Sequence, residues 1–95
     1  MRIIWTRGAV DDANALVLAL HETSPRAARR LTEEFALAGE RLSDFPRMGI
    51  RADEKGRFSI LVARGRFRMS YRIDDDAVRI LGLSWAAARW SSEAR

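Results

Sequence analysis

After Ala9 the hydrophobic pattern of this chain changes its period once, and that change limits the possible folds more than any other feature. From Ala9 to about Leu42 the apolar residues recur every three or four positions, as they do in amphipathic helices. From Phe58 to Ser84 they recur every second position, which is typical of strands with one buried face. A helical half therefore precedes a β half, and this order predicts an α+β fold.

Two helices are expected in the first half. The first covers Ala9–His21, and we assign Asp11 and Asp12 to its first turn, where the helix dipole favours negative charge. Ser24 is a good N-cap for the second helix, and Pro25 suits its first position. Because only two residues separate the helices, they should form an antiparallel hairpin. The second helix carries one apolar stripe, which consists of Ala28, Leu31, Phe35, Ala38 and Leu42.

One strand is expected before the helices and three after them. The first covers Arg2–Trp5, and residues 50–57 read as a polar connecting loop. The predicted order is β-α-α-β-β-β, with the helical hairpin packed on one face of a small, antiparallel-dominated sheet. All 95 residues form one domain, in which residues 91–95 are expected to be a frayed tail. The later strands are Phe58–Ala63, Phe67–Ile73 and Val78–Ser84, joined by turns at Arg64-Gly65 and Asp74–Asp76.

The face of the sheet away from the helices is left open, and arginines are expected on it. Alternation in the central strand places Arg66, Arg68 and Arg72 there, in a row about 7 Å apart. Residues 47–95 contain eleven Lys and Arg against six Asp and Glu. Arginine binds phosphate and carboxylate groups bidentately, so the row is either a surface for an anionic partner or a solvated, polar strand face.

Several classes of function are excluded by composition. The chain has no cysteine and one histidine, so neither a disulfide nor a metal site is expected, and no cofactor is implied. The position of His21 at a helix end is explained by the helix dipole without a role as a general base. Because no apolar stretch approaches the roughly 20 residues needed to span a bilayer, we expect a cytoplasmic protein with no membrane partner.

Four segments occur in an order that resembles one family. The first strand ends in Trp5-Thr6, and the second helix opens with Ser24–Ala28. Leu42–Gly49 is similar to a leucine–aromatic–proline–glycine signature, and Gly65–Asp76 is similar to a Tyr-Arg hairpin. Over residues 3 to about 90 the chain thus resembles the ParE/RelE toxin superfamily of bacterial type II toxin–antitoxin (plasmid stabilisation) systems. The Leu42–Gly49 signature favours the ParE-like branch.

The resemblance implies a toxin that a co-expressed antitoxin holds inactive. ParE-like members poison DNA gyrase and are not enzymes, whereas RelE-like members cleave messenger RNA on the ribosome. The favoured interpretation is a gyrase inhibitor neutralised by a ParD-type antitoxin. The alternatives are a ribosome-dependent mRNA endonuclease, a member with lost or different toxicity, and a plain nucleic-acid-binding or structural module.

The residues that the nuclease branch uses are mostly missing here. Its two second-strand lysines correspond to Ser59 and Leu61, which are neither basic nor proton carriers. Arg68 matches the third-strand arginine, and Arg89 lies one place from the C-terminal arginine, so these two would be catalytic only in a nuclease. The nuclease branch also uses a tyrosine near the C-terminus, but the single tyrosine here, Tyr71, shares a face with core residues. The histidine that often follows the last strand of ParE-like members is absent as well.

Two interaction surfaces are predicted. The Trp85–Trp90 tail either stacks on bases, anchors a partner protein or folds back onto the core, and these alternatives stay open. The residues predicted to contact the target or an anion are Arg64, Arg66, Arg68, Arg72, Arg89 and Trp90. The residues predicted to contact the antitoxin are Leu31, Phe35, Leu42 and Trp85.

Overall fold

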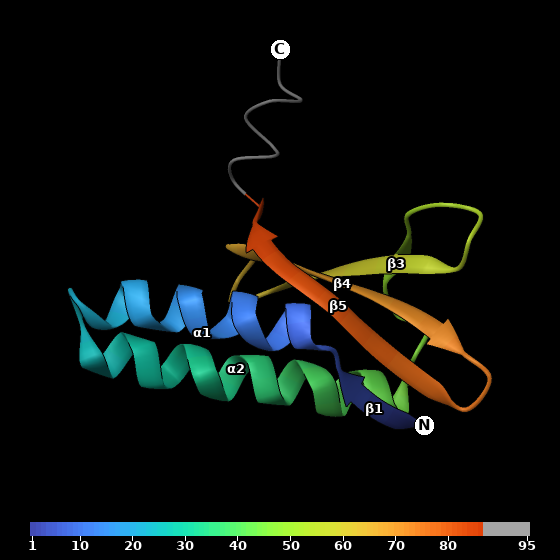
Figure 1. Ribbon diagram of the computed structural model, residues 1–95, viewed down its shortest axis with the longest axis horizontal. Coiled ribbons are helices and arrows are strands. Elements are labelled where there is room, and N and C mark those ends of the chain that lie inside the picture. Colours follow the sequence, from blue (N-terminus) through green and yellow to red (C-terminus); the bar gives the residue numbers. More distant parts are fainter. Residues whose placement is uncertain (87–95) are drawn as a thin grey trace, which may run out of the picture.

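A helical hairpin covers one face of a five-stranded sheet in the computed structural model, which describes residues 1–86 (Figure 1). The strand order is β1-β5-β4-β3-β2, and every neighbouring pair is antiparallel except β1 and β5. The predicted α+β fold, with the hairpin on one face of the sheet, is confirmed. The elements in chain order are β1 (Arg2–Trp5), α1 (Arg7–His21), α2 (Pro25–Asp44), β2 (Ile50–Arg51), β3 (Arg57–Val62), β4 (Phe67–Asp74) and β5 (Ala77–Trp85).

The structure adds one short strand to the predicted order. Ile50 and Arg51 were expected in a loop, but they form β2 and pair antiparallel with Ser59 and Phe58 at the edge of the sheet. A strand of two residues has no alternation that a sequence could reveal. The last strand is also longer than predicted, since β5 includes Trp85.

The start of α1 differs from the prediction, and the reason is its cap. The Thr6 side chain accepts a hydrogen bond from the Ala9 N–H at 3.3 Å, so the helix begins at Arg7. The first turn therefore contains no acidic residue, and the assignment of Asp11 and Asp12 to it was wrong. The predicted dipole contact of His21 holds, because this residue lies in the last turn of α1.

The start of α2 and its apolar stripe are as predicted. The Ser24 side chain accepts from the Ala27 N–H at 3.1 Å, and Pro25 occupies the first turn, where a backbone N–H is not needed. The stripe of α2 faces the sheet, and the core lies between the two layers. The large core side chains come from α2, β4 and β5. They are Leu31, Phe35 and Leu42 of α2, Phe67, Met69 and Tyr71 of β4, and Val78 and Ile80 of β5.

The buried hydroxyl of Tyr71 holds the segment that connects α2 to β2. Tyr71 is 0% exposed, and its OH donates to the Pro46 carbonyl at 2.8 Å and accepts from the Gly49 N–H at 3.0 Å. A Cβ atom on Gly49 would lie 2.6 Å from both the Tyr71 OH and the Ser59 carbonyl oxygen, so only glycine fits there. The Leu42–Gly49 and Gly65–Asp76 motifs of the sequence are therefore in direct contact.

Replacing Tyr71 with Phe should destabilise the protein, because it leaves the Pro46 carbonyl and the Gly49 N–H without their partner. We expect a loss of about 1–3 kcal/mol in the free energy of unfolding, measured by urea denaturation. Thr23→Val is the control, since the exposed Thr23 hydroxyl donates to the Leu20 carbonyl at 3.1 Å. It should change stability by no more than about 0.5 kcal/mol.

Wild type and Tyr71→Phe should also differ in how their free energy of unfolding changes at alkaline pH. Burial raises the pKa of the Tyr71 phenol, although the hydrogen bond from the Gly49 N–H opposes this rise. Because the pKa is higher in the folded state, the contribution of Tyr71 is complete below the unfolded-state pKa of about 10 and is lost as pH rises above it. The stability gap between wild type and Tyr71→Phe should therefore narrow above that pH. A gap that stays constant would contradict the buried phenol.

Candidate anion-binding face

Three arginines stand side by side on the open face of the sheet. The strand register pairs Arg57 of β3 with Arg72 of β4, and Arg72 with Arg79 of β5. Neighbouring strands lie about 4.8 Å apart, so the three residues fall within about 10 Å, and like charges this close repel. Acidic side chains reduce this repulsion by pairing with the two outer arginines of the row.

The outer arginines are ion-paired, whereas the middle one has no ion pair within residues 1–86. Arg57 Nε lies 3.6 Å from the Asp53 carboxylate, and Arg79 Nε lies 2.6 Å from the Asp74 carboxylate. Arg72 Nε is shielded from solvent and has no acceptor among residues 1–86. The row therefore keeps a net positive charge at its centre.

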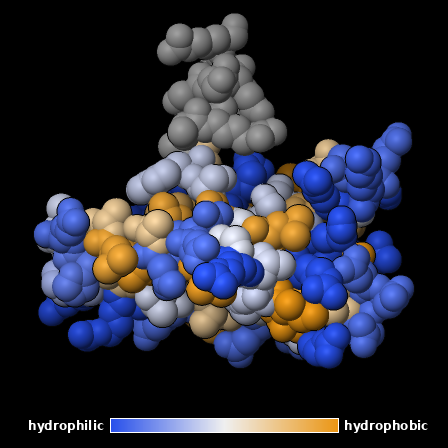
Figure 2. Space-filling view, viewed as in Figure 1, coloured by the Kyte–Doolittle hydropathy of each residue, from blue (hydrophilic) through white to orange (hydrophobic). Residues whose placement is uncertain are grey.

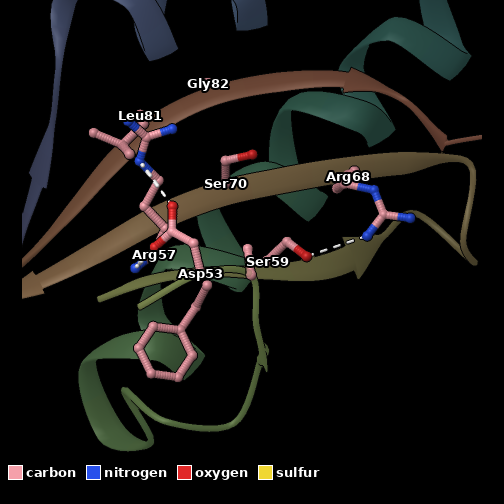
Figure 3. Close-up of a pocket in the computed structure, with 9 residues that line it drawn as sticks. Asp53, Arg57, Ser59, Arg68, Ser70, Leu81 and Gly82 are labelled. Carbon is pink, nitrogen blue, oxygen red and sulfur yellow. Dashed lines mark hydrogen bonds and ion pairs between the residues drawn. The ribbon is translucent and has the colours of Figure 1, made fainter. Parts of the chain in front are cut away.

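Beside this row lies a hollow floored by two serines, which we call the serine hollow (Figure 3). Ser59 of β3 and Ser70 of β4 face each other across the strand pair. Arg68 lies at one end of the hollow, where its Nη1 donates to the Ser59 hydroxyl at 3.1 Å, while its Nε is shielded and has no acceptor among residues 1–86. The hollow has a volume of about 370 Å³, and its lining residues are Ala52, Asp53, Arg57, Phe58, Ser59, Arg68, Ser70, Leu81 and Gly82.

Asp53 is the one carboxylate among residues 1–86 that lines the serine hollow, and its charge is already matched. Desolvation opposes its ionisation, but hydrogen bonds from the backbone N–H groups of Lys55 and Arg57, together with the charges of those residues, hold the pKa of Asp53 below its ordinary value. The ionised Asp53 pairs with Arg57. Arg68 is consequently the arginine in the hollow whose charge no described carboxylate balances.

A bulge in β5 shapes the remaining wall of the serine hollow. Ser70 pairs with Gly82, but Tyr71 pairs with Ile80, so Leu81 is an extra residue in β5. The side chain of Asp12 in α1 accepts a hydrogen bond from the Leu83 N–H at 3.0 Å, which ties the bulge to the helix layer. A Cβ on Gly82 would lie 2.9 Å from the same carboxylate. Asp12 thus positions the bulge, a role that its place in the sequence did not indicate.

The row predicted from the sequence, which consisted of Arg66, Arg68 and Arg72, is correct for two of its three members. Arg68 and Arg72 lie on the open face, as the alternation required. Arg66 was placed wrongly, because it precedes β4 and its Nε donates to the Ala63 carbonyl at 3.2 Å in the turn. Its guanidinium lies 5.9 Å from the centre of the Phe67 ring, on the side of the hairpin that meets α1. Arg64 is exposed at the tip of the same turn.

The positions that correspond to nuclease residues do meet on the open face. Leu61 pairs with Arg68, and Ser59 is hydrogen-bonded to it. RNA cleavage by 2′-OH attack needs a proton acceptor and a proton donor. A serine, a leucine and a permanently charged arginine do not supply them, and Tyr71 is buried with its hydroxyl engaged in the loop.

The residues predicted to contact an antitoxin differ strongly in accessibility. Leu31, Phe35 and Leu42 are 1%, 4% and 0% exposed, so the sheet and the neighbouring helix cover them. Trp85 is 52% exposed, with its ring 4.6 Å from that of Phe67. It borders an apolar hollow of about 170 Å³, which we call the Trp85 hollow and which is lined by Leu16, Ala19, Leu20, Arg66, Phe67 and Trp85. Arg89, Trp90 and residues 91–95 lie outside the described residues.

The surface in Figure 2 shows separate hydrophobic patches, one of them over α1, between hydrophilic side chains. No helix within residues 1–86 is long and apolar enough to cross a membrane. In the same part of the chain, no three His, Asp or Glu side chains gather as possible metal ligands.

Comparison with known proteins identifies similar sequences and folds. Residues 3–86 match the model of a family described as the ParE toxin of the type II toxin–antitoxin system parDE. A solved structure of the chromosomal ParDE system of P. aeruginosa is similar in fold, with a TM-score of 0.78 and 19% identity over 90% of this chain and 96% of that chain. The RelBE2 toxin–antitoxin complex of Mycobacterium tuberculosis gives a TM-score of 0.57 and 30% identity over 90% and 91%. No curated protein matches the chain.

Replacing Asp12 with Ala should loosen the bulge that forms a wall of the serine hollow. The Leu83 N–H loses its acceptor, so we expect a loss of about 1–3 kcal/mol in the free energy of unfolding and faster amide hydrogen exchange at Leu83. Asp11→Ala is the matched control, because Asp11 is exposed and is the adjacent carboxylate. Equal effects of the two substitutions would show that charge on α1, and not this hydrogen bond, is what matters.

Proposed function

The chain belongs to the ParE toxin family of type II toxin–antitoxin systems, and we propose that it inhibits DNA gyrase and is neutralised by a ParD-type antitoxin. The chemistry of the open face is the observation that supports a gyrase-directed toxin over a nuclease. Arg68 is present, but Ser59 and Leu61 occupy the positions where a nuclease needs proton carriers. A toxin of this composition acts by binding.

The loop that precedes β2 also supports the ParE branch. Its proline and glycine are the two residues that Tyr71 holds, through the Pro46 carbonyl and the Gly49 N–H. Those contacts give the Leu42–Gly49 signature a structural purpose in a binding protein, because they fix the edge of the open face without placing a reactive group on it.

The target surface of the proposal is centred on Arg68 and Arg72, with Arg64 at the exposed tip of the adjacent hairpin. Arg68 and Arg72 carry charge that no described carboxylate balances. A partner with negative charge would gain both attraction and hydrogen bonds there. Arg66 is not part of this target surface, because it lines the Trp85 hollow. Arg89 and Trp90 follow β5 in the chain and stay proposed contacts.

The Trp85 hollow is the proposed contact for the antitoxin. Both solved relatives come from toxin–antitoxin systems, and this chain presents a half-exposed tryptophan beside apolar residues of α1. Tryptophans that are partly buried in such pockets often dominate binding energy. The buried Leu31, Phe35 and Leu42 would then act by shaping the helix layer, and an apolar segment of the antitoxin would cover Trp85.

Purified protein titrated into a DNA supercoiling reaction should inhibit gyrase and cause cleaved DNA to accumulate. Arg68→Gln should weaken the inhibition, because it removes an unbalanced charge from the proposed target surface. Arg30→Gln, an equal change of charge on the exposed side of α2, should leave inhibition unchanged. Absence of any effect on gyrase, combined with mRNA cleavage on translating ribosomes, would replace this proposal with the nuclease alternative.

Trp85→Ala should weaken binding of the cognate antitoxin by roughly thirtyfold, which corresponds to the loss of about 2 kcal/mol typical of a buried aromatic contact. Isothermal titration calorimetry measures this change. Ile50→Ala is the control, because Ile50 is 75% exposed on β2, at the far edge of the sheet. Equal affinities of wild type and Trp85→Ala, with both proteins folded, would move the antitoxin to another surface.

A further inference from the structure

The serine hollow presents several hydrogen-bond donors, and the described chain leaves one of them, Arg68 Nε, without an acceptor. The hydroxyls of Ser59 and Ser70 lie on its floor, and the guanidinium of Arg68 lies at one end, hydrogen-bonded to Ser59 (Figure 3). The Nη1 atom of Arg68 uses the Ser59 oxygen, but its Nε is shielded from solvent and has no acceptor within residues 1–86. An oxyanion in the hollow would accept from both the guanidinium and the hydroxyls.

The charge of the hollow also favours an anion. The Nε–H group of Arg68 is shielded from water without an acceptor, which is unfavourable because its lost hydration is not replaced. Asp53, the one carboxylate at the hollow, is committed to Arg57 and to two backbone N–H groups. Arg72, on the same face of β4, has the same deficiency at its Nε. Two unbalanced guanidinium groups therefore lie along one strand.

We infer that the serine hollow is a binding subsite for the phosphodiester backbone of a nucleic acid, with Arg68 as its main anchor and Arg72 as a second contact. Guanidinium and hydroxyl groups are among the donors that contact backbone phosphates. Arg68 and Arg72 are four residues apart, or about 13 Å along an extended strand. A free phosphate bound at Arg68 would leave Arg72 unmatched, whereas a polyanion reaches both.

An apolar side chain beside Arg68 supports a nucleic acid over an acidic peptide. Leu61 pairs with Arg68 in the register, shares its face, and is 55% exposed. Sugars and bases lie next to each phosphate of a nucleic acid strand and can cover such a side chain. This contact goes beyond the proposed inhibition of gyrase, because it needs no gyrase subunit.

The test measures fluorescence anisotropy of labelled oligonucleotides with the purified full chain and without gyrase. Single-stranded DNA, duplex DNA and RNA of one sequence form separate arms, at several salt concentrations between about 50 and 200 mM. Wild type should bind at low salt and lose affinity as salt rises. Arg68→Gln should weaken binding about tenfold or more, and should lower the slope of log affinity against log salt by about 0.7–0.9.

Two further variants separate the hollow from general charge. The double substitution Ser59→Ala and Ser70→Ala removes the hydroxyls without changing charge, so it should weaken binding and leave the salt slope intact. Arg30→Gln removes one charge from α2 and should keep wild-type affinity and slope. Circular dichroism melting of each variant confirms that it is folded.

Several results would overturn the inference. They are no oligonucleotide binding at low salt, equal losses for Arg68→Gln and Arg30→Gln, and displacement of the oligonucleotide by inorganic phosphate or by an acidic peptide at matched charge concentration. Preference for DNA or RNA identifies which nucleic acid carries the phosphodiester. The binding test contains no gyrase, so its outcome does not depend on the proposed function. A protein that binds oligonucleotides in this test but does not inhibit gyrase in the supercoiling reaction would refute only the proposed function.

Discussion

The hydroxyl of Tyr71 is the contact on which the rest of the structure depends. It lies in the core of β4, yet it fixes both the Pro46 carbonyl and the Gly49 N–H of the segment between the helices and the later strands. Gly49 leads directly into β2, and β2 pairs with Ser59 of β3. One buried polar group thereby joins the helix layer, the edge of the sheet and the floor of the serine hollow. A phenylalanine would pack there but would hold none of these.

The open face is not uniformly basic, and this matters for its function. Arg57 and Arg79 are each paired with an aspartate, so their charges are partly neutralised. Arg68 and Arg72 remain unmatched among the described residues, next to hydroxyls and an exposed leucine. Within residues 1–86 the open face thus keeps positive charge beside hydrogen-bond donors.

The two proposed surfaces use different residues. The serine hollow is built from β3, β4 and the bulge of β5, whereas the Trp85 hollow joins α1 to the end of β5. They are linked through the Asp12 side chain, which holds the Leu83 N–H of β5 from α1.

The sequence by itself determined the α+β class, the helix caps at Ser24 and Pro25, the core stripe of α2 and the outward direction of Arg68 and Arg72. These follow from local periodicity and capping chemistry, which act between neighbours in the chain. Only the tertiary structure decided that Arg57 and Arg79 flank Arg72, that Arg66 turns toward α1, that Ile50 and Arg51 form a strand, and that Asp12 supports a bulge. Each of these depends on strand register or on contacts between segments that are distant in the chain. A local sequence pattern does not show which distant segments meet.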